Sequence, residues 1–196
     1  MPRETGSIRS RPRGCVLICD WRGSIVRSAP GSVQLWLTEP MTDGVLPAEV
    51  RPDSVVVLQL AGESAVMCLE IDEATEHSPT IRARLSAYER ALAGRDGWHL
   101  VWVVPTEERL GWLRRVARWD QRSGLERCSW GLVLDELRTA GLRARTQPVG
   151  WSGDAVSLEA VIADPRQRRC PTPVGSPGWV RLLGSGGAEE TDEALT

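Results

Sequence analysis

Two short apolar runs stand in the middle of the chain, at residues 54–60 and 65–69, separated by the turn-like segment Ala61-Gly62-Glu63-Ser64. Apolar, β-branched runs that flank a glycine-containing turn are typical of a β-hairpin. The hairpin places Asp53 at the start of its first strand and Glu70 near the end of its second, and these ends are neighbours in an antiparallel pair. Side chains two positions apart on a strand share a face, so Asp72 points the same way as Glu70. The pattern therefore predicts that three carboxylates converge at one end of the hairpin.

The apolar pattern changes its period after the hairpin. Apolar residues recur at three- and four-residue spacing over residues 79–93, which predicts a helix with one buried face. Ser78 precedes this helix and is expected to cap it. A continuous apolar run at residues 98–104 predicts a buried strand. Thr106 is expected to cap a second helix that reaches about residue 121.

The remaining apolar segments are shorter. Residues 15–21 and 33–37 have the pattern of strands, and residues 128–133 that of a short strand followed by a helical turn over residues 134–140. Residues 155–163 are interpreted as a further strand. Together these elements predict an α/β fold, in which a mixed β-sheet is flanked by helices.

Composition adds a domain plan. Residues 1–14 form a basic arm that we expect to be flexible, residues 15–163 an α/β domain, and residues 164–196 a disordered tail rich in Gly, Ser and acidic residues. No apolar stretch is long enough to span a membrane and no apolar segment follows the N-terminal arginines, which predicts a cytoplasmic protein with no membrane partner. The five cysteines are scattered and odd in number, so they indicate neither a disulfide framework nor a zinc site.

Charge is unevenly distributed along the chain. The net charge is only −2, but residues 38–80 hold nine acids against one Arg, while residues 81–145 hold thirteen Arg against eight acids. All 24 basic side chains are arginines, so no lysine can serve a catalytic site or a phosphate-binding loop. An acidic site beside an arginine-bearing surface suits a polyanion such as DNA. Each arginine, taken singly, is equally well explained as part of a solvated helix face.

Three segments in this order resemble the C-terminal region of the replication-relaxation family and, more widely, the core of the PD-(D/E)XK nuclease-like fold. The resemblance covers roughly residues 50–140 and implies an accessory role in plasmid or mobile-element DNA processing, including conjugation. It implies DNA as a partner, with a relaxase or a DNA translocase as a candidate protein partner. The segments are Arg51-Pro52-Asp53-Ser54-Val55-Val56, Leu69-Glu70-Ile71-Asp72-Glu73-Ala74-Thr75-Glu76 and Arg82-Ala83-Arg84-Leu85-Ser86-Ala87-Tyr88.

The resemblance implies a Mg²⁺ or Mn²⁺ site at Asp53, Glu70 and Asp72, because these ions prefer hard oxygen ligands. Such an ion could activate water for phosphodiester cleavage, with these acids as the catalytic group. Active relatives carry Lys where this chain has Asp72, and Arg84 is the candidate to restore the missing positive charge. Arginine stays protonated and is a poor base, so nuclease activity is in doubt. Without the resemblance, the three acids are better explained as ordinary surface residues.

Three functions stay open at this point. The first is a metal-dependent DNA endonuclease, the second a non-enzymatic accessory that binds DNA, and the third an interaction protein unrelated to nucleic acid. Tryptophans could stack on unpaired bases, but most lie at spacings better suited to the core. The arginines expected to contact DNA are Arg82, Arg84, Arg114, Arg115 and Arg118.

Overall fold

The computed structural model describes residues 23–60, 62–118, 125 and 128–164. It has one seven-stranded sheet in which the strands follow one another in chain order. A short helix at residues 23–28 precedes the first strand. The strands are β1 (Val33–Thr38), β2 (Ser54–Leu60), β3 (Glu63–Ile71), β4 (Trp98–Val104), β5 (Ser129–Val133), β6 (Arg145–Pro148) and β7 (Val156–Ser157). The helices are α2 (Ser78–Leu92), α3 (Glu107–Arg118), α4 (Leu134–Ala140) and α5 (Leu158–Ala163), with a 3-10 turn at Gly141–Arg143.

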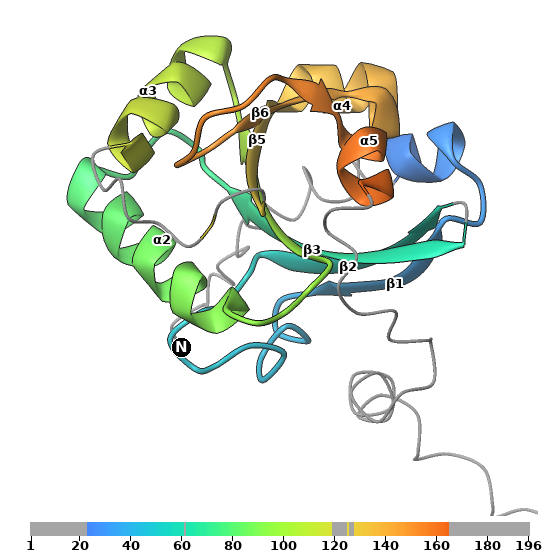
Figure 1. Ribbon diagram of the computed structural model, residues 1–196, viewed down its shortest axis with the longest axis horizontal. Helices are drawn as coiled ribbons and strands as arrows, with labels where there is room; N and C mark the ends of the chain where they lie inside the picture. The colour runs from blue at the N-terminus through green and yellow to red at the C-terminus, as the bar shows by residue number, and fades with distance from the viewer. Residues whose placement is uncertain (1–22, 61, 119–124, 126–127, 165–196) are drawn as a thin grey trace, which may run out of the picture.

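The sheet is mixed. Strands β1, β2 and β3 form an antiparallel meander, whereas β3, β4 and β5 are parallel neighbours joined by α2 and α3. Strands β6 and β7 return antiparallel at the far edge. Figure 1 shows α2 and α3 side by side on one face of the sheet, with α4 and α5 on the other. The fold is therefore α/β with helices on both faces, as the sequence predicts.

Each face of the sheet has its own apolar core because strand side chains alternate. On β2, Val55 and Val57 belong to the core under α2 and α3, while Val56 and Leu58 belong to the core on the opposite face. A strand buried on both faces reads as a continuous apolar run, which is the pattern of β2 and β4.

Several sequence predictions are confirmed. The hairpin forms with Ser54 opposite Leu69, and the first crossover helix and the strand after it lie at the expected residues. Thr106 caps α3, because its Oγ1 accepts a hydrogen bond from the backbone N–H of Arg109 at 3.2 Å. The short strand β5 is followed by α4, as expected.

Two predictions are wrong. Ser78 is the first residue of α2 rather than its cap; His77 holds the cap position, and no side chain there accepts a hydrogen bond from the helix. Residues 155–163 are mostly helix, since only Val156–Ser157 is a strand. Ser157 then caps α5 by accepting a hydrogen bond from the N–H of Ala160 at 3.1 Å.

Other predictions concern parts of the chain that lie outside the described residues: the arm at 1–14, the strand at 15–21, the tail beyond residue 164 and the end of the second helix past Arg118. No described helix is long and apolar enough to cross a membrane.

Candidate functional site: an acid–arginine cluster

The three predicted carboxylates lie at one end of the hairpin. Asp53 and Glu70 come one step beyond the paired residues Ser54 and Leu69, so they face each other across β2 and β3. Asp53 is half-buried, and its Oδ2 accepts a hydrogen bond from the N–H of Ile71 at 2.7 Å. Glu70 and Asp72 are buried, with exposed fractions of 2% and 3%. The structure therefore brings the three acids together on the face covered by α2 and α3.

Both oxygens of Glu70 are held by α2. Arg84 Nη1 donates to Oε2 at 2.8 Å, and the Tyr88 hydroxyl donates to Oε1 at 2.5 Å. Arg84 and Tyr88 are four residues apart, so they project from the same side of the helix. The second guanidinium nitrogen of Arg84 donates to Oε1 of Glu76 at 2.6 Å. Arg84 thus bridges the strand acid and an acid of the loop that leads into α2.

Asp72 is held by α3 in the same manner. Arg109 Nε donates to Oδ2 at 2.6 Å and Nη2 to Oδ1 at 3.0 Å, a two-pronged pair in which both carboxylate oxygens accept. The same Nη2 donates to the backbone carbonyl of Glu76 at 2.8 Å. The guanidinium also lies over the ring of Trp112, 3.8 Å from its centroid. Arg109 is therefore oriented by hydrogen bonds from Nε and Nη2 and by contact with the Trp112 ring.

Carboxylates outnumber guanidinium groups in this cluster. Burial, and then the nearby Asp53 carboxylate, raise the pKa of Glu70 to about 8, against the opposing effect of Arg84. Burial also raises the pKa of Asp53, although the hydrogen bond from Ile71 works against this. The folded protein therefore favours a bound proton among these acids more than the unfolded chain does.

The buried carboxylates of this cluster already have hydrogen-bond donors as partners. A magnesium ion binds carboxylate oxygens, and it would have to compete at Glu70 and Asp72 with the donors Arg84, Tyr88 and Arg109. Within residues 23–60, 62–118, 125 and 128–164, no group of three His, Cys, Asp or Glu side chains is arranged to hold a metal. The guanidinium groups of Arg84 and Arg109 supply the positive charge beside Glu70 and Asp72. The Mg²⁺ or Mn²⁺ site at Asp53, Glu70 and Asp72 stays a prediction.

Sequence reasoning missed Arg109, the partner of Asp72. Strands β3 and β4 are parallel neighbours, so their carboxyl ends meet, and the N–H of Asp72 donates to the carbonyl of Val103 at 3.0 Å. The first turn of α3 follows β4 directly, which brings Arg109 to Asp72. A basic residue in the first turn, where the helix dipole favours acids, was the available signal.

The five predicted DNA-contacting arginines do not lie together. Arg82, Arg115 and Arg118 are exposed. Arg84 binds the acids, as described above. Arg114 Nε donates to the carbonyl of Pro148 at 3.1 Å and Nη1 to Oε1 of Gln147 at 2.6 Å, so this arginine joins α3 to β6.

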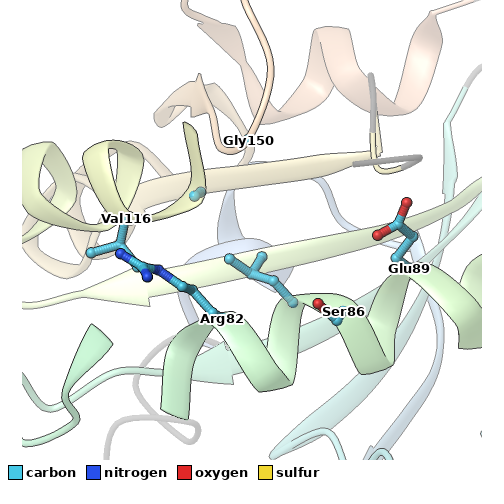
Figure 2. Close-up of a pocket in the computed structure, with 7 residues that line it drawn as sticks. Arg82, Ser86, Glu89, Val116 and Gly150 are labelled. Carbon is cyan, nitrogen blue, oxygen red and sulfur yellow. The ribbon is translucent and has the colours of Figure 1, made fainter. Parts of the chain in front are cut away.

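A small cavity lies between α2 and the end of α3 (Figure 2). Its volume of about 20 Å³ has room for a water molecule but not for a nucleobase or a sugar. It is therefore not a ligand site in this conformation. The lining residues are Arg82, Leu85, Ser86, Glu89, Val116, Ala117 and Gly150.

Comparison of the chain with protein-family models, with curated proteins and with solved structures gave no significant match in any of the three.

Proposed function

We propose that this protein is a DNA-binding accessory of plasmid or mobile-element DNA processing, with a nuclease-like arrangement that does not cleave DNA. One observation carries the non-cleaving part of the proposal: the buried carboxylates that a nuclease would present to a metal are paired with Arg84 and Arg109. The resemblance to the replication-relaxation family supplies the biological setting.

The order of elements supports the nuclease-like part of this proposal. A meander of three antiparallel strands leads through α2 to the parallel strand β4, and Asp53 and Glu70 face each other at the end of the hairpin. This is the sequence of hairpin, helix and strand on which the resemblance to the PD-(D/E)XK core rests.

The contacts of Asp72 argue against catalysis. A general base or metal ligand needs an available lone pair, whereas Arg109 engages both oxygens of this carboxylate. Side-chain exposure is 12% for Arg109 and 1% for Asp72, so the pair is shielded from water. Separating a buried ion pair leaves an uncompensated charge and costs roughly 3–5 kcal/mol. An active nuclease would have to meet that cost before binding its metal.

Two assays on the full chain test the proposal. Incubation with supercoiled and linear DNA in Mg²⁺ or Mn²⁺ should leave the DNA intact, and fluorescence anisotropy at low salt should detect binding that weakens steeply as salt rises. Cleavage that is abolished by Glu70→Ala would establish the endonuclease instead. Absence of binding at low salt would favour an interaction protein unrelated to nucleic acid.

A further inference from the structure

Arg114 lies where α3 meets β6, and two neutral oxygens orient its guanidinium. Nε donates to the carbonyl of Pro148 at 3.1 Å, and Nη1 donates to Oε1 of Gln147 at 2.6 Å. Among the described residues, none accepts a hydrogen bond from its Nη2. These contacts set the direction of the side chain and leave the Nη2 side of the guanidinium for another acceptor.

No carboxylate of the described residues compensates the charge of Arg114 by direct contact. The acid that raises its pKa is Glu107, which is joined to it through Gln147, since Gln147 Nε2 donates to Glu107 Oε2 at 3.3 Å. Other arginines are paired directly with carboxylates: Arg51, Arg84, Arg90, Arg109 and Arg138. Arg114 therefore differs from these arginines in having an oriented charge without a direct counter-charge.

Arg118 adds a second charge on the same side of α3. It follows Arg114 by four positions, and residues four apart on a helix are neighbours. Burial, and then the charge of Arg118, lower the pKa of Arg114. Arg118 is exposed, and no described carboxylate forms an ion pair with it. A bound anion would relieve both the repulsion between the two groups and the cost of burying Arg114. We call Arg114 and Arg118 the arginine pair.

The arginine pair lies on open surface. The small cavity of Figure 2 is lined by Val116 and Ala117 of α3 but by neither arginine. Sites for small molecules bury most of their ligand, so the pair does not have the form of such a site. A phosphate of a polymer backbone needs no enclosure, and its oxygens match the planar donor fork of arginine.

We propose that the arginine pair holds one backbone phosphate of bound DNA. The inference rests on the DNA-binding function proposed above and names the residues and the group that they contact. Arg114 supplies an oriented donor, Nη2, and Arg118 supplies a second, exposed charge. Phosphate contacts position a protein on DNA but carry no sequence information. The pair should therefore contribute equally on unrelated DNA sequences.

The test is fluorescence anisotropy of the full chain with two unrelated short duplexes over a range of salt concentrations. Arg118→Gln should weaken binding about tenfold at low salt, as expected for the loss of one charge-assisted hydrogen bond. The double variant, Arg114→Gln with Arg118→Gln, should lower the slope of log K against log salt by about 0.9, the value for one phosphate. Both losses should be the same on the two duplexes.

Arg115→Gln is the matched control, because it removes the same charge from the same helix. Nη1 of Arg115 lies 3.6 Å from a Cβ atom built at Gly111, so this side chain reaches back along α3, away from Arg118. The control should keep the wild-type slope. A double variant with the wild-type slope overturns the proposal. A loss of about 1.8 means that each arginine holds its own phosphate, which overturns the shared site.

Further outcomes separate this proposal from the DNA-binding function itself. Absence of wild-type binding at low salt overturns that function and the pair's role with it. Stabilisation by inorganic phosphate in melting curves, lost in the double variant while the DNA slope is unchanged, assigns the pair to a small anion and overturns the DNA contact. Arg114 also joins α3 to β6, so Arg118→Gln, which leaves those contacts in place, is the deciding variant if Arg114→Gln unfolds. Wild-type affinity in Arg118→Gln then overturns the proposal.

Discussion

At the scale of single residues, the pair of Arg109 and Asp72 decides what the cluster can do. Two hydrogen bonds of 2.6 and 3.0 Å orient the guanidinium, and Trp112 supports it from one side. Paired buried charges of this kind add little net stability, but each partner is costly to leave alone. The pair thus ties the first turn of α3 to the end of β3, and both oxygens of Asp72 accept hydrogen bonds from it.

Replacing Arg109 tests this role. Arg109→Met should lower the free energy of unfolding by roughly 3–5 kcal/mol, because Asp72 then stays buried without its counter-charge. Adding Asp72→Asn should restore part of the loss, since the uncompensated charge is gone. Urea denaturation measures both. Arg115→Met, on the exposed side of the same helix, should stay within about 0.5 kcal/mol of wild type. Equal effects at the two arginines would contradict a structural ion pair.

At the scale of elements, α3 packs closely on β5 because that strand carries a glycine. A Cβ atom added at Gly131 would lie 2.5 Å from Cδ1 of Leu110 and 3.0 Å from Cγ2 of Val149. Leu110 is buried and belongs to the core under α3, so it has little room to move. The close approach of helix and strand also fixes the first turn of α3, from which Arg109 reaches Asp72.

Two glycine substitutions measure that contact. Gly131→Ala should destabilise the protein by roughly 1–3 kcal/mol, because the added methyl group overpacks the space beneath α3. Gly111→Ala is the matched control on α3, where the nearest atom to the new Cβ is the flexible Nη1 of Arg115 at 3.6 Å. It should stabilise by about 0.5–1 kcal/mol, since glycine is costly inside a helix. Thermal unfolding compares them, and a neutral Gly131→Ala would show that α3 can move away from β5.

Elements with long, clear apolar patterns are predictable from this sequence, and short ones are not. The hairpin and α2 follow from runs whose period is unmistakable. The segment before Asp164 is a helix where the sequence predicts a strand, because Leu158, Val161 and Ile162 form a run too short to distinguish the two. The pairing of Asp53 with Glu70 follows from hairpin register alone. The contact of Arg109 with Asp72 does not, because it joins residues 37 positions apart and depends on β3 and β4 being neighbours.

At the scale of the whole molecule, the sheet buries a different titratable group on each face. Glu70 lies under α2, as described above. His99 is on β4 and shares the opposite face with Val101, whose core includes Leu158 and Val161 of α5. His99 is 1% exposed, and its Nδ1 lacks a hydrogen-bond partner among the described residues. Burial lowers the pKa of His99 to about 4, despite the opposing charge of Asp164.

We expect Glu70 and His99 to give opposite slopes of the unfolding free energy against pH. The contribution of His99 is present above its ordinary pKa of 6.5 and is lost as pH falls through about 4, because the unfolded chain then binds the extra proton. This loss is on the order of 3 kcal/mol. The pKa of Glu70 is instead raised, from 4.5 to about 8, so its contribution is present below pH 4.5 and is lost as pH rises through about 8. The two slopes cancel between pH 4.5 and 6.5, so the unfolding free energy should be greatest and nearly constant there, and it should decline from pH 6.5 to about 8 and from pH 4.5 to about 4.

Urea denaturation of the wild type, Glu70→Gln and His99→Leu across this pH range separates the contribution of Glu70 from that of His99. Glu70→Gln cannot ionise, so it should remove the decline above pH 6.5 and leave stability rising from about pH 4 to 6.5, where only His99 titrates. His99→Leu removes the buried imidazole, so stability should decline steadily from pH 4.5 to about 8, where only Glu70 titrates. The effects should be independent, since the two groups lie on opposite faces of the sheet and share no hydrogen-bond partner. If Glu70→Gln leaves the alkaline decline intact, the carboxylate is ionised in the folded protein throughout the range. In that case Arg84 and Tyr88 stabilise its charge more than burial and Asp53 oppose it.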